Sequence, residues 1–256
     1  SITAIQGTID EGTDTNQVMV TWQSPLPDLT NVSWDSIPNT SMGDEYPYAI
    51  IPLHRLEESD LLPFHEHRLT HISFIADASA TDYHIVVYKG GGLSDYGRRL
   101  DAGTKILDKP LNMSDLTMGE WNTIALDTPI VIDASQELWY GLYIAAPAHT
   151  AAVQVGGSEC VPFKGNIYGY DFAGEVFWYP YSDNFVLKAT IDNPFVQYEV
   201  YRDDSLLTTT TNETSYADYP PVYAHYTYEV QAVWNDQCSH GVSQMVNFRP
   251  PCHVVN

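Results

Sequence analysis

Apolar and polar residues alternate with a period of two along most of this chain, and this pattern predicts β-strands. Residues 1–24 contain two such segments, "SITAIQGTID" and "NQVMVTWQSP", with a turn between them. Residues 26–49 are rich in Pro, Asn, Ser and Asp and are predicted to form a loop. Strand patterns then resume in "YAIIPLHRL", "RLTHISFIAD", "DYHIVVYKGG", "KILDKPLNM", "EWNTIALDTPIVID", "ELWYGLYIAA", "AAVQVGG" and "NFVLKATI". Their spacing favours a two-sheet sandwich of the jelly-roll type.

Only one segment has helical character. Residues 57–64, "EESDLLPF", begin with acidic side chains, and Pro63 is expected to end the helix. The sequence contains no long amphipathic helix, no P-loop, no G-x-G-x-x-G motif and no nucleophile elbow. The pattern therefore predicts an all-β protein.

The C-terminal segment, residues 195–250, has the pattern of an incomplete β-sandwich. It contains about five strands, whereas an immunoglobulin-like sandwich needs about seven. Residues 1–24 supply two strands without a sandwich of their own, and Trp22 suits a core position on the second. We therefore predict a jelly-roll β-sandwich inserted into a fibronectin type III/Ig-like β-sandwich, since exposed loops tolerate insertions. The predicted parts are 1–25 plus 193–250 for the discontinuous domain, 26–192 for the insert and 251–256 for a C-terminal linker or tail.

Two sets of residues resemble modules of known bacterial proteins. The order "VTWQSP", a long insert and "YEVYRDDSLL…TSYAD…YTYEVQAVW" resembles fibronectin type III domains of secreted and surface proteins of the Bacteroidetes. The insert resembles the jelly-roll modules called cleaved adhesin or gingipain-adhesin-like domains, in which a "WN-x-V-x-L" strand precedes a "P-x-x-ID-x-x-x-ELW-x-G" hairpin. The matching residues are Trp121, Asn122, Leu126, Pro129, Ile132, Asp133, Glu137, Leu138, Trp139 and Gly141.

The resemblance implies a non-enzymatic binding module of an extracellular or cell-surface bacterial protein, an adhesin that recognises a host protein or glycan. A carbohydrate-binding accessory module of a polysaccharide-degrading enzyme and a ligand-free structural spacer are the alternatives. Several relatives coordinate Ca²⁺ near the start of the insert. Asp35, Asp44 and Glu45 are therefore the candidate calcium ligands in this sequence. The chain is expected to be a monomer.

Charge narrows the range of partners. The chain has 11 Lys and Arg residues against 33 Asp and Glu residues, which gives a formal net charge of −22. This field repels a phosphate backbone and anionic membrane surfaces, so we expect no nucleic-acid partner. No apolar run reaches the roughly 18 residues that a membrane-spanning helix needs, so membrane insertion is not expected. No signal-peptide pattern precedes the first strand, as expected of a mature or trimmed chain.

The segment "YGYDFAGEVFWYPYSDN", residues 168–184, contains the densest group of aromatic residues. Rigid aromatic rings beside Asp and Asn suit a sugar ring or a hot spot of a protein interface. Tyr170, Trp178, Tyr179 and Tyr181 are therefore the candidate ligand-binding residues. The alternative is a loop-rich aromatic plug that closes one end of the sandwich.

Other groupings are weaker as functional sites. His65, His67 and His71 fall within seven residues, but they lie at a helix-to-strand junction and lack the spacing of a zinc site. Cys160 and His149 do not form a known nucleophile motif. Cys238 and Cys252 are expected to lie too far apart for a disulfide. No pair of carboxylates is singled out for catalysis, and we expect no enzymatic activity.

Overall fold

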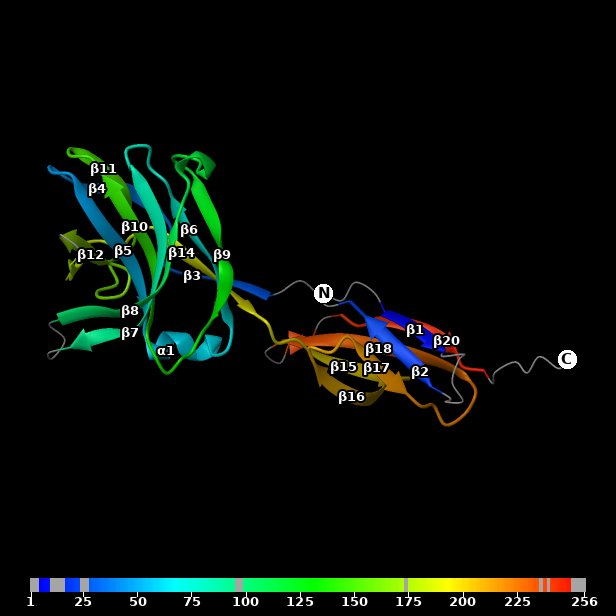
Figure 1. The fold of residues 1–256 in the computed structure, drawn as a ribbon. Helices are drawn as coiled ribbons and strands as arrows, with labels where there is room; N and C mark the ends of the chain where they lie inside the picture. Colours follow the sequence, from blue (N-terminus) through cyan, green and yellow to red (C-terminus); the bar gives the residue numbers. More distant parts are fainter. Residues whose placement is uncertain are drawn as a thin grey trace. The chain divides into compact units, whose positions relative to one another are not determined.

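The computed structural model describes residues 5–9, 17–23, 28–94, 99–172, 175–234, 237–238 and 240–249 of the 256. The protein is an all-β sandwich protein, as its alternating pattern predicts (Figure 1). The chain divides into two compact units. One is discontinuous and consists of Ser1–Asp28 with Asn193–Asn256, and the other is the continuous segment Leu29–Asp192.

The continuous unit is a two-sheet sandwich of antiparallel strands. One sheet has six strands in the order β13-β12-β5-β10-β7-β8, and the other has four in the order β3-β14-β6-β9. Strands β11 and β4 form a separate pair. The strands are β3 (Asp28–Asp35), β4 (Pro38–Asp44), β5 (Tyr48–Leu56), β6 (Arg68–Ile75), β7 (Asp82–Ser94), β8 (Arg99–Pro110), β9 (Trp121–Val131), β10 (Leu138–Ala146), β11 (Thr150–Gly156), β12 (Ile167–Phe172), β13 (Glu175–Pro180) and β14 (Leu187–Asn193).

Helical structure in this unit is confined to short turns. The expected helical segment forms α1 (Glu58–Leu61) and the 3-10 turn η1 (Leu62–Phe64), and a second turn, η2, spans Met113–Asp115. Glu57 and Asp60 form a capping box at the start of α1. Pro63 lies in η1, and a proline at this point keeps the helical segment from continuing. The segment therefore consists of the four residues of α1 and the three of η1.

Two strands form where the sequence predicted a loop. Residues 26–49 contain β3 and β4, both rich in polar residues, because each lies at the edge of its sheet. An edge strand needs backbone pairing on one side only, so its hydrophobic pattern is weak. The prediction of a loop here is therefore wrong.

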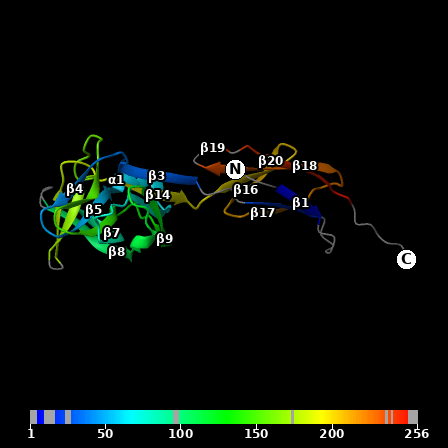
Figure 2. The same ribbon diagram turned by 90° about the horizontal axis from the view of Figure 1, so that it is seen from above.

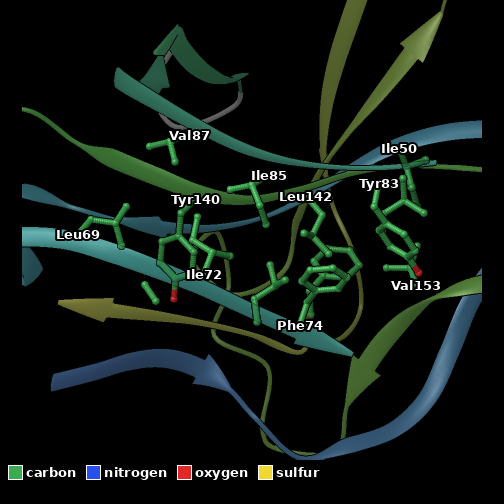
Figure 3. Close-up of a cluster of buried hydrophobic side chains, with 14 of the residues drawn as sticks. Ile50, Leu69, Ile72, Phe74, Tyr83, Ile85, Val87, Tyr140, Leu142 and Val153 are labelled. Atoms are coloured by element: carbon green, nitrogen blue, oxygen red, sulfur yellow. The ribbon is translucent and has the colours of Figure 1, made fainter. Parts of the chain in front are cut away.

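The main core lies between the two sheets of this unit. Figure 3 shows Ile50, Ile85 and Leu142 of the six-stranded sheet facing Ile72 and Phe74 of the four-stranded sheet. Each of these side chains is almost completely buried. Burial of a large apolar side chain contributes about 1.5–3 kcal/mol. This core therefore fixes the faces that each strand presents to solvent.

A second core covers the outer face of the six-stranded sheet. Its buried members are Ile51, Leu53, Val86, Tyr88, Leu100, Ala102, Trp139 and Ile167. Arg55 enters this layer with a side chain only 5% exposed, and its guanidinium group pairs with the Glu137 carboxylate at 2.5 Å. The same carboxylate accepts a hydrogen bond of 2.8 Å from the Trp139 indole. Glu137 therefore satisfies two buried donors at once.

The discontinuous unit is also a two-layer sandwich. One sheet has the order β1-β2-β17, and the other contains β16-β15-β18-β19 with β20 paired to β18. The N-terminal strands lie among the C-terminal ones, with β2 beside β17 and β1 near β20 (Figures 1 and 2). The strands are β1 (Ile5–Ile9), β2 (Val18–Trp22), β15 (Gln197–Arg202), β16 (Ser205–Thr211), β17 (Ser215–Asp218), β18 (His225–Trp234), β19 (Gln237–Cys238) and β20 (Val242–Asn247).

The core of this unit depends on both ends of the chain. Val18, Val20 and Trp22 of β2 are 0%, 0% and 6% exposed and pack with buried residues of β15, β18 and β20. The Trp22 ring lies 5.3 Å from that of Tyr198. The Tyr226 hydroxyl, near the start of β18, donates to the Val222 carbonyl at 2.8 Å. This bond has the form of the tyrosine corner of immunoglobulin-like sandwiches.

His54 is a buried histidine that links the two sheets of the continuous unit. Its Nε2 lies 2.8 Å from the Phe185 carbonyl oxygen, which only accepts, so Nε2 carries the proton. Nδ1 is then an acceptor, and the backbone amide of Trp34 in β3 donates to it at 3.4 Å. The Tyr140 hydroxyl lies 3.1 Å from Nδ1 and donates to the Val32 carbonyl at 2.8 Å. Burial lowers the pKa of His54 to about 4, although the Phe185 bond and the charge of Asp35 act in the opposite direction. The imidazole is therefore neutral at neutral pH.

This lowered pKa predicts a loss of stability in acid. In the unfolded chain the imidazole has a pKa of about 6.5, so above that pH it is neutral in both states and adds no pH dependence. Between about pH 6.5 and pH 4 only the unfolded chain binds the proton. The free energy of unfolding is expected to fall by roughly 3 kcal/mol across this window.

Urea unfolding of the wild type and of His54→Gln, each between about pH 7 and pH 4, measures this effect. Carboxylates titrate alike in both proteins, so the difference between the two curves isolates the histidine. We expect the stability advantage of the wild type to shrink as the pH falls. Parallel curves over the whole range would show that His54 does not resist protonation.

Candidate functional site

The aromatic segment forms a β-hairpin at one edge of the six-stranded sheet. Strand β12 pairs with β5 on one side and with β13 on the other. Opposite residues of an antiparallel pair lie on the same face, so this register divides the aromatic residues into two sets. Tyr168, Tyr170, Phe172, Phe177 and Tyr179 share one face, which we name the aromatic face. The sequence analysis treated this segment as loop-rich, but its aromatic residues favour strands, and two strands form.

Trp178 lies on the opposite face of the hairpin. Its ring is 5.4 Å from that of Tyr88 and 6.1 Å from that of Trp139, both in the second core. Gly169 stands opposite Trp178 in the register, and a Cβ there would come within 2.7 Å of the indole. The missing side chain leaves room for the indole beside the backbone of Gly169. Trp178 therefore anchors the hairpin.

The aromatic face is partly open to solvent. Phe172, Phe177 and Tyr179 are 68%, 45% and 45% exposed. Tyr168 and Tyr170 are half-buried and pack against the main core, and the Tyr168 ring lies 5.7 Å from that of Tyr179. Half-buried rings thus support exposed ones, which fixes the exposed rings at low entropic cost.

Tyr181 follows the hairpin and closes it. Its ring stacks on that of the buried Phe185 at 5.8 Å, and its backbone amide donates to the Asn166 carbonyl at 2.6 Å. Burial raises the pKa of the Tyr168 hydroxyl, and Tyr179, Tyr181 and Asp44 raise it further. Of the four predicted residues, Tyr170 and Tyr179 lie on the aromatic face, and Trp178 and Tyr181 hold the hairpin in place.

The candidate calcium ligands are separated by strand β4. Asp35 precedes the strand and is 4% exposed, and its two oxygens accept hydrogen bonds from the amides of Ile37 and Ser158, each at 2.9 Å. Asp44 ends the strand and accepts a bond from the Tyr46 amide at 3.1 Å. Glu45 is exposed. Across the described part of the chain, no three His, Cys, Asp or Glu side chains form a group that could hold a metal ion.

The histidine and cysteine candidates serve local structure. The ring of His65 accepts a bond from the Ala134 amide at 3.2 Å, and His71 lies 2.9 Å from the Thr70 hydroxyl. Burial raises the pKa of the Cys160 thiol, and the charge of Asp183 raises it further. A raised pKa lowers the thiolate fraction and disfavours nucleophilic attack. Cys252 and the side chain of Cys238 lie outside the described residues.

A groove that the sequence analysis did not identify crosses the outer face of the four-stranded sheet. Its volume is about 350 Å³. It is lined by Leu29 and Asn31 of β3, Lys188 and Thr190 of β14, His71 and Ser73 of β6, and Trp121 and Thr123 of β9. The signal in the sequence is a period-two row of polar residues on strands whose alternate residues are core. Locating the groove required the strand order, which the pattern alone does not supply.

Comparisons with known proteins add little. No family model matches the chain, and no curated protein matches it. One solved structure that aligns with it is the tripod (BppUct-A-L) from the baseplate of bacteriophage Tuc2009, at 8% identity and a TM-score of 0.17. The alignment covers 89% of this chain and 100% of that one. A likeness at this level supports no argument about function. Within the described residues, no helix has the length and hydrophobicity needed to cross a membrane.

Proposed function

We propose that this chain is a non-enzymatic binding module of a secreted or cell-surface protein, and that it binds a partner protein through the aromatic face. The observation that carries the proposal is the exposure of Phe172, Phe177 and Tyr179 on a hairpin anchored from behind by Trp178. Exposed aromatic side chains on a rigid support match the composition of protein-interface hot spots.

The chemistry of the aromatic face favours a protein over a sugar. Phe172 and Phe177 carry no hydrogen-bonding group, so together they offer apolar area without the polar contacts that saccharide hydroxyls require. Burying an exposed aromatic ring in a partner contributes more than a rim charge does. A partner protein with an apolar pocket is therefore the better fit.

The described groups with large pKa shifts support binding rather than catalysis. Burial lowers the pKa of His54 and raises that of Tyr83, Tyr88, Tyr140 and Tyr228, and all five side chains are at most 6% exposed. Groups enclosed in a core do not reach a substrate. Their pKa shifts result from burial in the core, and none of these residues lies on the aromatic face.

The proposal predicts that binding to a partner protein depends on the side chains of Phe177 and Tyr179. The purified chain, tested by biolayer interferometry against a panel of extracellular-matrix and cell-surface proteins, is expected to bind at least one of them. Phe177→Ser combined with Tyr179→Ser should weaken this binding by roughly thirtyfold or more, because two hot-spot rings are lost.

The matched control is Tyr219→Ser, which removes a tyrosine that is 61% exposed in the discontinuous unit. It should leave binding unchanged. A panel without any binder would favour a ligand-free spacer. Equal binding by the double variant would place the contact elsewhere on the chain.

A carbohydrate-binding accessory module is the second candidate function. It is favoured by one observation, the groove on the four-stranded sheet, whose lining combines an indole with hydroxyl and amide side chains. This surface belongs to the opposite sheet from the aromatic hairpin. The two proposals can therefore be tested separately.

A further inference from the structure

The groove owes its shape to the order of side chains across the four-stranded sheet. Lys188, Ser73 and Thr123 stand in one row across β14, β6 and β9, because Ser73 is the register partner of both others. Thr190 and His71 form the next row. Short side chains line the floor between the longer side chains of Trp121, Lys188 and His71. Its volume of about 350 Å³ falls within the range of small-molecule sites.

The floor of the groove is held in one arrangement. The hydroxyls of Ser73 and Thr123 lie 2.9 Å apart, and the Thr190 hydroxyl donates to the Asn31 amide oxygen at 2.9 Å. Ser73 and Thr190 are only 6% and 9% exposed. These bonds hold the polar groups of the floor in place before a ligand binds, which reduces the entropic cost of binding.

Lys188 stands out among the lysines of this acidic chain. The sequence has five lysines, and four of them lie within 4.0 Å of a carboxylate: Lys89, Lys105, Lys109 and Lys164. Lys188 forms no ion pair with any described carboxylate. Its ammonium group instead lies 3.7 Å from the centroid of the Trp121 ring. Among the residues that line the groove, none is acidic.

Lys188 and Trp121 together provide two kinds of contact. The half-buried indole offers an apolar surface of the kind on which a sugar ring packs. The ammonium group adds a positive charge that the groove leaves without a carboxylate partner. Asn31, His71 and Thr123 add donors and acceptors that suit sugar hydroxyls.

We propose that this groove binds a saccharide that carries a single carboxylate group, of the sialic acid or uronic acid class. The carboxylate pairs with Lys188, the sugar ring packs on Trp121, and the hydroxyls meet the polar floor. This site is independent of the aromatic face, so it stands or falls without the protein partner proposed above.

The charge of the whole chain limits the ligand to one or few negative groups. At a net charge of −22, a polyanion such as a heavily sulfated glycan or a nucleic acid is repelled along its length. A single carboxylate feels chiefly the local charge of Lys188, because salt screens exposed charges beyond about 8 Å at physiological ionic strength. A neutral sugar would leave Lys188 without an anionic partner.

A glycan array tests the proposal directly. It should carry matched oligosaccharides that end in a neutral sugar, a sialic acid, a uronic acid or a sulfated sugar. We expect the full chain to bind carboxylate-bearing members, and Lys188→Met to bind them at least about tenfold more weakly, since charged hydrogen bonds are lost. Lys105→Met is the matched control, because it removes the same charge from strand β8 of the other sheet.

Trp121→Leu should weaken the binding of the same ligands. A thermal melt of each variant checks that the variant is folded. The NMR signal of the Trp121 indole N–H should shift in the wild type on addition of a binding saccharide. Binding only to neutral members, only to sulfated members or to none would overturn the proposal. Full binding by Lys188→Met, or loss of binding in Lys105→Met as well, would also overturn it.

Discussion

Replacing Glu137 by alanine is expected to lower the free energy of unfolding of the continuous unit by about 3–5 kcal/mol. The carboxylate accepts two hydrogen bonds from the Arg55 guanidinium group, at 2.7 Å and 2.5 Å, and one from the Trp139 indole. Its removal leaves the guanidinium group buried with one carboxylate partner, Glu57, at 2.8 Å. It also leaves the indole N–H of a fully buried Trp139 without its acceptor.

Urea unfolding at neutral pH measures this effect. Glu137→Gln retains an acceptor oxygen but loses the charge, so its cost should fall between those of the alanine variant and the wild type. The control is Glu45→Ala, at an exposed position, which should change stability by less than about 0.5 kcal/mol. If Glu137→Ala behaved like Glu45→Ala, the ion pair would not be a stabilising element of this sheet.

Replacing Trp22 by alanine should destabilise the discontinuous unit by about 3–5 kcal/mol. Trp22 is 6% exposed and packs with buried residues that lie more than 170 positions later in the sequence. Its substitution removes the largest side chain that β2 contributes to this core. Hydrogen exchange should therefore accelerate in β15 and β18, although neither strand is changed.

The indole nitrogen of Trp22 is buried and has no hydrogen-bond partner among the described residues. Trp22→Phe removes this unsatisfied donor and keeps most of the apolar volume. We expect it to cost much less than the alanine variant. Unchanged exchange in β15 and β18 of Trp22→Ala would mean that the N-terminal strand is not part of their core.

The all-β class and many core positions could be predicted from the sequence, because a strand with one buried face has an apolar residue at every second position. Val18, Val20 and Trp22 alternate in β2, and Ile72 and Phe74 do so in β6. Edge strands were harder, since β4 is largely exposed and its residues follow no apolar period. The polar composition of β4 reflects its position at the edge of a sheet, whereas the sequence analysis took it for a loop.

Several of the residues that carry the adhesin resemblance have structural roles here. Glu137 and Trp139 belong to the buried ion-pair cluster, and Asp133 accepts bonds from the Ser135 amide and hydroxyl. A Cβ on Gly141 would come within 2.0 Å of the Pro52 carbonyl oxygen. These residues of the motif therefore describe how a strand packs, whereas Trp121, another of its residues, lines the groove.

The candidate sites show where reasoning from the sequence stops. Density of aromatic residues identified the segment, but the register was needed to separate Trp178 from Tyr179. The groove joins residues from four strands between positions 29 and 190, so no local pattern contains it. Sites built across a sheet depend on strand order, and strand order is a property of the fold.

The most direct test of the binding proposal is hydrogen–deuterium exchange of the full chain with and without a protein partner found in the binding panel. Ile167–Phe172 and Glu175–Pro180 are expected to gain the largest protection, because their exposed rings become buried. The strands of the discontinuous unit should exchange as in the free protein. Protection confined to that unit, or to β3, β14, β6 and β9, would contradict the assignment of the interface to the aromatic face.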